Sequence, residues 1–276
     1  MESDKTAALT TVTSFLATVG ANGSSLKDAR QYILADSFVT LSHPDGLIQS
    51  HLGEAISRVE NSLQKLFDNG VSSTSEEIAL PGPEVWIRDN ITAVWVGYKH
   101  VVDNANVSKG VNLFSLLKTE TDLAWRICGI ADTQWKPDQP TPDMSSEVTP
   151  ELMEPINEFF TLMRQRKWNE LPTTLLPGGG MTHNAAGEPL RQVTWPEFVE
   201  GLSGVIDKIP KEVDVNEKVH DVEARVCGDL AFVWTPFVVE FNGVVKQKGV
   251  NIWSLLKKDE KWFISGCQDT GRSVGA

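Results

Sequence analysis

The chain has 276 residues, of which 41% are hydrophobic and 22% charged, enough for two domains with their own apolar cores. The formal net charge is −12 and basic residues form no run, which argues against a nucleic-acid-binding surface. The first ten residues carry acids where a signal peptide needs bases, and no apolar run approaches the roughly 18–20 residues of a membrane span. We therefore expect a cytoplasmic protein with neither nucleic acid nor membrane as a partner.

The first half of the chain changes from a helical to an alternating period. Helical periodicity predicts helices over residues 4–19, 25–34 and 50–67, with a short strand at 38–41 before a turn at 43–46. After Gly70 the period becomes two, and strands are expected over residues 73–80, 84–87, 91–102, 107–118 and 124–133.

A proline-rich segment over residues 137–149 separates the halves and predicts a semi-rigid linker. The second half then begins with Thr149-Pro150, which is typical of a helix start. Thr194 and Glu197 predict a capping box for a later helix, and Asn242-Gly243 predicts a tight hairpin. Long strands are expected over residues 213–226, 230–241, 244–257 and 262–267.

One ten-residue stretch occurs twice, as KGVNLFSLLK over residues 109–118 and KGVNIWSLLK over residues 248–257. The copies are 139 positions apart and identical at eight of ten positions, which indicates a duplicated unit. We predict two fused α+β cone-like domains, residues 1–136 and 150–276. Each has about three N-terminal helices packed on a curved antiparallel sheet, with a pocket between the layers.

The chain has three cysteines, Cys128, Cys227 and Cys267, which is an odd number, and they occupy different positions in the two halves. A disulfide framework is therefore not expected, and buried thiols in a reducing compartment are. No Cys/His spacing predicts a metal site, and no motif predicts an organic cofactor.

Each half also ends in a shared pattern of glycine, aromatic residues and Asp-Thr. In the first half Lys109-Gly110-Val111-Asn112 precedes Trp125-Arg126-Ile127, Gly129 and Asp132-Thr133; in the second, Lys248-Gly249-Val250-Asn251 precedes Trp262-Phe263-Ile264, Gly266 and Asp269-Thr270.

This pattern resembles the last hairpin of the nuclear-transport-factor-2-like superfamily, specifically its SnoaL-like branch, over nearly the whole chain apart from the linker and the ends. The superfamily includes isomerases, dehydratases, cyclases, epoxide hydrolases and non-catalytic binders. Its domains commonly pair through the outer faces of their sheets. The resemblance therefore implies an intramolecular pseudo-dimer and leaves further oligomerisation open.

Polar residues kept in both halves are the candidates for chemistry. His43 and His183 follow a short strand, and the other candidates are Asn112 and Asn251 on the repeated strand and Asp132 and Asp269 on the last strand. A carboxylate that fixes an imidazole suits proton abstraction from a carbon acid, and an asparagine can donate to a developing oxyanion. The resemblance implies a carboxylate where His43 and His183 stand, so this sequence departs from the pattern there. The alternative is that these residues only satisfy loop, bulge or chain-end backbone groups.

Candidate substrate-binding residues are of two kinds. Alternation places Tyr98 and His100 on one face of a strand in the first half, where the second half has Phe237 and Val239. The recurring aromatic residues are Trp95, Trp234, Phe114 and Trp253, for which the alternative is sheet core or inter-domain contact.

The sequence thus favours a cofactor-independent acid–base enzyme, a lyase or isomerase of the isomerase, dehydratase or cyclase type. Its expected partner is a small hydrophobic metabolite, polyketide-like or terpenoid-like. The alternative is a non-catalytic small-molecule-binding or assembly module with the same fold. An enclosed cavity of roughly 300 Å³ or more with His43 or His183 at its wall would favour a ligand site, whereas side chains that fill both cones would favour the alternative.

Overall fold

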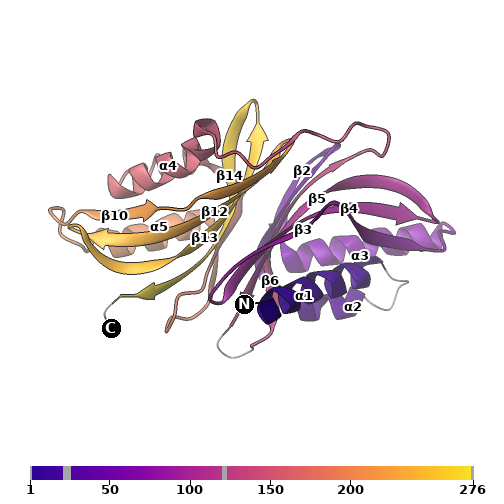
Figure 1. Cartoon of the computed structure of the whole chain (residues 1–276), viewed down its shortest axis with the longest axis horizontal. Helices are drawn as coiled ribbons and strands as arrows, with labels where there is room; N and C mark the ends of the chain where they lie inside the picture. The colour runs from indigo at the N-terminus through magenta and orange to yellow at the C-terminus, as the bar shows by residue number, and fades with distance from the viewer. Residues whose placement is uncertain (1, 21–25, 120–122, 275–276) are drawn as a thin grey trace. The chain divides into compact units, whose positions relative to one another are not determined.

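The computed structural model describes residues 2–20, 26–119 and 123–274, and the chain divides into two compact units, Met1–Asp143 and Met144–Ala276. Figure 1 shows helices and strands in both units. None of the helices in the described residues has the length and apolar composition needed to cross a membrane. Cys128, Cys227 and Cys267 are buried and form no disulfide with one another within the described residues.

The first unit places its helices on a sheet whose strands are not consecutive in the chain. Its helices are α1 (Glu2–Gly20), α2 (Leu26–Ala29), the 3-10 helix η1 (Arg30–Tyr32) and α3 (Leu52–Asp68). Its strands are β1 (Ile33–His43), β2 (Gly46–His51), β3 (Thr74–Arg88), β4 (Ile91–Val102), β5 (Ala105–Lys118) and β6 (Trp125–Trp135). Within the described residues they form a six-stranded sheet in the order β2-β1-β6-β5-β4-β3.

The sheet of the first unit is mixed, whereas the sequence predicts an antiparallel one. Strands β3 to β6 form the expected antiparallel meander, but β1 runs parallel to β6. The chain leaves β1 through the β2 hairpin and α3 before it enters the meander, so the last strand of the meander returns beside β1 in the same direction. This parallel pair brings together residues that are about 90 positions apart in the chain.

The apolar faces of α1 and α3 cover one face of this sheet (Figure 1). Phe15 of α1 meets Phe114 of β5 edge to face, with ring centroids 6.1 Å apart. Leu52, Ile56 and Leu63 are buried at helical spacing along α3. The helices therefore stand over the middle of the sheet and enclose space between the layers.

The second unit repeats this strand order. Its helices are α4 (Pro150–Arg164), the 3-10 helix η2 (Leu171–Thr174) and α5 (Trp195–Ile206). Its strands are β7 (Met144–Ser145), β8 (Leu175–His183), β9 (Arg191–Thr194), β10 (Val215–Val219), β11 (Glu223–Cys227), β12 (Leu230–Phe241), β13 (Val244–Lys258) and β14 (Lys261–Ser273). Among the described residues the order is β7-β11-β12-β13-β14-β8-β9, with β10 also paired to β12 and β8 parallel to β14.

Three local signals of the second half are confirmed. Thr149 caps α4 by accepting from the Leu152 N–H, with Pro150 in the first turn, and Thr194 with Glu197 forms the capping box of α5. Asn242 and Gly243 both have positive φ, 49° and 77°, as a two-residue hairpin turn requires. The second helix expected from the first half is reduced here to the 3-10 helix η2.

The repeated glycine of each half lies where backbone and aromatic ring meet. A Cβ on Gly110 would overlap the Thr133 carbonyl oxygen and lie 2.6 Å from the Tyr98 ring. A Cβ on Gly249 would overlap the Thr270 carbonyl oxygen and lie 2.6 Å from the Phe237 ring. Because real side chains do not approach so closely, each position requires glycine if the neighbouring ring is to lie flat on the strand.

Candidate functional site

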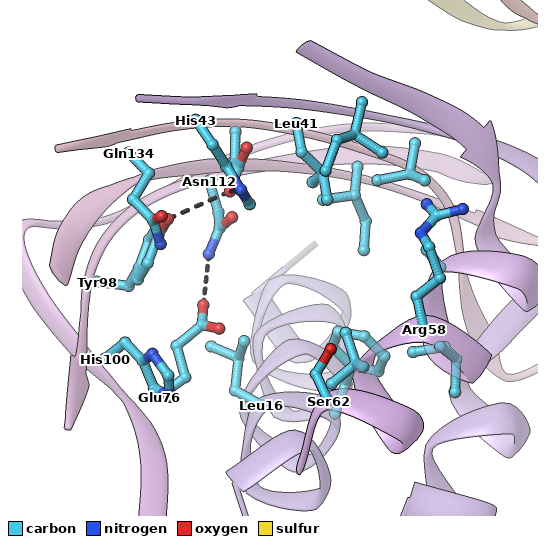
Figure 2. A pocket seen from close by; sticks show the side chains of 18 of the residues that line it. Leu16, Leu41, His43, Arg58, Ser62, Glu76, Tyr98, His100, Asn112 and Gln134 are labelled. Atoms are coloured by element: carbon cyan, nitrogen blue, oxygen red, sulfur yellow. Dashed lines mark hydrogen bonds and ion pairs between the residues drawn. The ribbon is translucent and has the colours of Figure 1, made fainter. Parts of the chain in front are cut away.

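The first unit contains a cavity of about 460 Å³ between its helices and its sheet (Figure 2). Its volume exceeds the roughly 300 Å³ expected of a small-molecule site, and His43 is part of its wall. Most of the wall is apolar, formed by Phe15, Leu16, Val39, Leu41, Ile48, Leu52, Ala55, Ile56, Val59, Leu63, Leu66, Phe114 and Ile130. Figure 2 shows the polar residues His43, Glu76, Tyr98, Asn112 and Gln134 together on one side.

His43 and Asp132 form the first polar pair of the cavity. The parallel register places Ser42 and Leu41 of β1 beside Thr133 and Asp132 of β6. The Ser42 N–H donates to Asp132 Oδ1 at 3.1 Å, and His43 Nε2 lies 3.4 Å from Asp132 Oδ2. The Asp132 side chain is 8% exposed and that of His43 28% exposed. The carboxylate is therefore fixed inside, while the imidazole reaches toward open space.

Tyr98 supports the same carboxylate from the neighbouring strands. Its phenol donates to Asp132 Oδ2 at 3.2 Å and the residue is 3% exposed. Burial raises the pKa of the Tyr98 hydroxyl well above its usual value, with the negative charges of Asp132 and Glu76 adding to the effect. Tyr98 is thus a neutral hydrogen-bond donor that holds Asp132 in place.

Glu76 and Asn112 form the second polar pair. Asn112 Nδ2 donates to Glu76 Oε1 at 2.7 Å, and both residues line the cavity (Figure 2). Glu76 lies on β3 opposite His100 of β4, so its side chain points to the cavity face of the sheet. Sequence reasoning missed Glu76, although it is the acidic residue that the predicted Asn112 contacts.

The pKa values of His43, Glu76 and Asp132 are all raised above their ordinary values. Burial raises the pKa of Glu76 to about 7, and the negative charge of Asp132 adds to this increase. The hydrogen bond from Asn112 lowers the pKa but does not offset the effect of burial. The hydrogen bond with Asp132 raises the pKa of His43 above its ordinary value. Burial raises the pKa of Asp132 more than the contacts with His43, Tyr98 and Ser42 lower it. Two titratable groups with raised pKa values, His43 and Glu76, therefore face one cavity.

His100 lines the cavity beside Glu76 but differs in protonation. Its Nε2 lies 2.8 Å from the Thr74 hydroxyl, and burial lowers the pKa of the imidazole. Tyr98 and His100 share the cavity face of β4, and Lys99 on the other face pairs with Glu77 at 2.8 Å. The neutral His100 can contribute a hydrogen bond to a ligand without adding charge.

The four aromatic candidates divide between the two faces of the sheets. Phe114 lines the cavity. Trp95 is buried but alternates with the cavity-side residues Val94 and Val96, so it lies on the opposite face and does not contact the cavity, which corrects its assignment as a substrate-binding residue. The reason is the period of two along β4.

In the second unit, Val233 pairs with Trp253 on the face of the sheet that the helices cover. Because side chains alternate along a strand, the neighbouring Trp234 lies on the opposite face. Trp253 packs edge to face on Phe159 and Phe160 of α4, with centroids 5.5 and 5.8 Å away. Its indole N–H donates to the Thr235 hydroxyl at 2.9 Å. Trp253 is thus a core residue, and neither tryptophan is placed as a substrate-binding residue.

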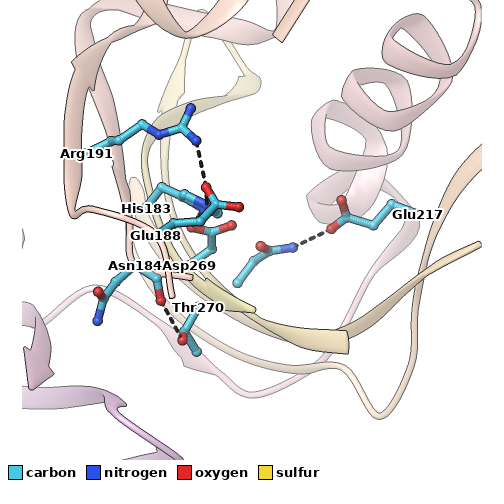
Figure 3. A network of polar contacts seen from close by, with 8 residues as sticks. His183, Asn184, Glu188, Arg191, Glu217, Asp269 and Thr270 are labelled. Atoms are coloured by element: carbon cyan, nitrogen blue, oxygen red, sulfur yellow. Dashed lines mark hydrogen bonds and ion pairs between the residues drawn. The ribbon is translucent and has the colours of Figure 1, made fainter. Parts of the chain in front are cut away.

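The second unit has the equivalent polar pairs, shown in Figure 3. The β8–β14 register places His183 opposite Asp269, with Nδ1 2.6 Å from Oδ1. Asn251 Nδ2 donates to Glu217 Oε1 at 2.9 Å, which repeats the Asn112–Glu76 contact. Burial raises the pKa of Glu217 to about 7. Burial lowers the pKa of His183, but the hydrogen bond with Asp269 and the negative charges of Asp269 and Glu188 together outweigh it, so that the pKa is raised.

The surroundings of these pairs differ from those in the first unit. The second ring nitrogen of His183 lies 3.8 Å from Glu188, which also binds Arg191 at 2.6 Å (Figure 3). Aromatic side chains pack between the helices and the sheet, including a Phe159–Phe198 stack at 5.9 Å and a Trp195–Phe198 contact at 6.1 Å. Phe237 stands where Tyr98 stands in the first unit, so Asp269 lacks the phenolic partner that Asp132 has.

The raised pKa values give stability a pH dependence of definite sign. A carboxyl whose pKa rises on folding from 4.5 to about 7 keeps its proton in the folded state where the unfolded chain has lost it. Stability therefore falls as pH rises between about 4.5 and 7, and the raised pKa values of His43 and His183 extend the fall to higher pH.

We expect the free energy of unfolding to fall by about 1–3 kcal/mol for each glutamate between pH 5 and 8, after allowance for their partial exposure. Urea unfolding at several pH values checks this. The variant Glu76→Gln/Glu217→Gln should lose most of the pH dependence. Parallel pH curves for this variant and the wild type would contradict the assignment.

Within the described residues, no three His, Cys, Asp or Glu side chains are arranged to hold a metal ion.

Comparisons with known proteins found similar solved structures. No protein-family model matches the chain, and no curated protein matches it. Similar solved structures include a Nostoc punctiforme protein of unknown function with a cystatin-like fold, with 13% identity, TM-score 0.38 and coverage of 47% of this chain and 96% of that chain. A Streptomyces avermitilis protein described provisionally as a dehydratase of the nuclear-transport-factor-2-like family has 15% identity, TM-score 0.37 and coverages of 46% and 95%.

A third similar structure, from Novosphingobium aromaticivorans, is described as nuclear-transport-factor-2-like with a cystatin-like fold; it has 15% identity, TM-score 0.35 and coverages of 44% and 79%. Each of these proteins covers about half of this chain.

Proposed function

We propose that the first unit is a cofactor-independent acid–base enzyme for a small, largely apolar metabolite, acting as an isomerase, dehydratase or cyclase. One observation carries the proposal. A cavity of about 460 Å³ with an apolar wall has two groups with raised pKa values, His43 and Glu76, and the pKa of Glu76 is about 7. Such groups can take and return a proton at physiological pH.

His43 is the proposed proton-transferring imidazole, with Asp132 as its positioning residue. Asp132 is held by the Ser42 N–H and the Tyr98 hydroxyl and in turn orients the ring through Nε2. The described residues provide no second partner for the His43 ring, so Nδ1 remains for a ligand. His183 differs, because carboxylates of Asp269 and Glu188 lie near both of its ring nitrogens.

Glu76 is the proposed second acid–base group. Asn112 binds one of its oxygens and leaves the other directed into the cavity (Figure 2). A dehydration needs one group to take a proton from carbon while a C=C bond forms from that electron pair. A second group then gives a proton to the departing hydroxyl, which leaves as water. An isomerisation needs only one of these groups to return the proton at a different carbon.

The second unit fits the alternative better, that of a non-catalytic binding or assembly module. Phe159, Phe160, Phe198 and Trp253 occupy its interior, and Phe237 replaces the tyrosine. We therefore assign catalysis to the first unit. His183, Asp269 and Asn251 of the second unit have no part in the proposed reaction.

Hydrogen–deuterium exchange at carbon tests this proposal before the natural substrate is known. We expect the whole chain in deuterated buffer to accelerate deuterium incorporation next to the carbonyl of one or more of 2-octanone, cyclohexanone and 4-hydroxy-2-butanone, followed by mass spectrometry. The reason is that each is a carbon acid small enough for the cavity. Incorporation no faster than in buffer alone, whether or not the ketones bind, would favour the binding-module alternative.

A further inference from the structure

One cationic side chain lines the cavity away from the proposed reacting groups. Arg58 of α3 lies across the cavity from Tyr98, His100 and Gln134 (Figure 2). It is the single Lys or Arg among the described residues that form the wall, and it is exposed at the rim. Building on the proposed function, we propose that the substrate is an organic anion with an apolar body, whose carboxylate or equivalent oxyanion binds Arg58.

The hydrogen bonds of Arg58 prepare it for such a group. Its Nη2 donates to the Ser50 hydroxyl at 2.6 Å, and that hydroxyl donates to the His51 carbonyl at 3.1 Å. In the described part of the chain, Ser50 is the hydrogen-bonding partner of this guanidinium and no carboxylate lies within ion-pair distance of it. Because a guanidinium carries five donors in a fixed plane, Arg58 retains donors for a carboxylate.

Three other arginines of this acidic chain form ion pairs with carboxylates. Arg30 lies 3.1 Å from Glu60, Arg164 lies 2.7 Å from Asp214, and Arg191 lies 2.6 Å from Glu188. With a net charge of −12, a cavity that faced only carboxyl groups would repel an anionic ligand. An arginine bound to a serine instead of a carboxylate gives the rim an attractive charge.

The two ends of the cavity fix the direction of the ligand. The carboxyl groups of Glu76 and Asp132 disfavour an anion at the inner polar side, and Arg58 favours one at the rim. Apolar side chains, among them Leu41, Leu52 and Val59, lie along the wall. The anion is therefore expected at Arg58 and the reacting carbon at His43 and Glu76.

The size of the cavity limits the apolar body. At roughly 30 Å³ for each water-sized group, 460 Å³ corresponds to about 15 groups. A medium-length chain or a one- to two-ring skeleton with an acid group fits this volume. The substrate class is thus a small amphipathic acid.

Calorimetric titration with three probes of equal chain length tests the role of Arg58. The full chain is titrated with octanoate, octan-1-ol and octylammonium at low salt and pH 7.5. We expect octanoate to bind most tightly, and Arg58→Gln to weaken it by about three- to tenfold, between the effects of losing an exposed ion pair and a charge-assisted hydrogen bond. Octan-1-ol should bind the variant and the wild type alike.

Arg30→Gln is the matched control, because Arg30 contacts α3 through Ser57 and Glu60 but does not line the cavity. It should leave the octanoate affinity unchanged. Equal octanoate affinity in Arg58→Gln and the wild type, or no octanoate binding to the wild type, would overturn the inference. A loss of octanoate binding in His43→Ala without a loss in Arg58→Gln would also overturn it, since the anion would then lie at the inner end.

The outcome is separable from that of the proposed function. Octanoate binding that depends on Arg58, with no deuterium incorporation into the ketones, would support the anion site and contradict catalysis. Deuterium incorporation with octanoate binding indifferent to Arg58 would support catalysis and contradict the anion site.

Discussion

Replacing Glu76 by glutamine is expected to lower the rate of deuterium incorporation into a ketone substrate by about 10²–10⁴-fold, the usual contribution of a positioned general acid or base. Glutamine has nearly the same shape and can still accept the Asn112 hydrogen bond, which spans 2.7 Å in the wild type. It cannot exchange a proton. Because burial disfavours the ionised glutamate, the variant should also be at least as stable as the wild type above pH 7.

Glu217→Gln is the matched control for this variant. Glu217 accepts from Asn251 at 2.9 Å and its pKa is likewise raised to about 7, so the substitution changes stability in the same direction. We expect it to retain the wild-type exchange rate, because Phe159 and Trp253 pack in the core of its unit and Phe237 stands in place of Tyr98. Similar losses in both variants would contradict the assignment of catalysis to the first unit, and an unchanged rate in Glu76→Gln would remove Glu76 from the mechanism.

The second large effect is expected from Gly110→Ala. A Cβ at this position overlaps the Thr133 carbonyl oxygen and the Tyr98 ring, and neither can move without disturbing β4 or β6. We expect a loss of about 2–3 kcal/mol in the free energy of unfolding, the range for overpacking a tight site. Urea unfolding measures this loss.

The same substitution should also slow exchange, because a displaced Tyr98 no longer holds Asp132. Gly82→Ala is the control within the unit, since a Cβ on Gly82 meets nothing within 4 Å. Gly249→Ala should destabilise the chain comparably, through the Thr270 carbonyl and Phe237, yet spare the exchange rate under conditions where the chain remains folded. Stability of Gly110→Ala equal to that of Gly82→Ala would contradict this reading of the repeated glycine.

The fold was largely predictable because its strongest signals are local. Alternation identified the long strands, and the Thr194–Glu197 box and the Asn242-Gly243 turn are complete within a few residues. The parallel pairing of β1 with β6 was not predicted. It depends on where the chain returns after α3 and the meander, which no local pattern records.

The candidate site was predictable where the repeat keeps the residue type. Asn112 and Asn251 occupy the same place in the repeated strand. His43 and His183 each contact the aspartate of the last strand, although Asp132 is opposite Leu41 whereas Asp269 is opposite His183. Alternation likewise placed Tyr98 and His100 on one face.

Glu76 and Glu217 escaped this comparison although they occupy equivalent places, opposite His100 and Val239. The first half reaches its fourth strand through the irregular Pro81–Pro83 region of β3, whereas the second half divides the same path between β10 and β11. The spacing of the glutamates from the repeated strand therefore differs between the halves. A search for acids opposite the same partner residue, rather than at one fixed distance, would have found them.

The role of the aromatic residues could not be settled from the repeat alone. Phe114 and Trp253 occupy one position of the repeated strand, yet Phe114 borders open space and Trp253 packs on Phe159 and Phe160. The difference comes from the helices, where α1 presents Phe15 and α4 presents two phenylalanines. Contacts between elements that are far apart in the sequence therefore determine whether a domain of this kind contains a cavity.

The comparison of His43→Ala with His183→Ala in the ketone exchange measurement tests the central claim most directly. His43 has a ring nitrogen left for a ligand in a cavity of about 460 Å³, whereas both ring nitrogens of His183 lie near carboxylates. We expect His43→Ala to lose deuterium incorporation while remaining folded, and His183→Ala to keep it. Retention of wild-type incorporation by His43→Ala would contradict the claim.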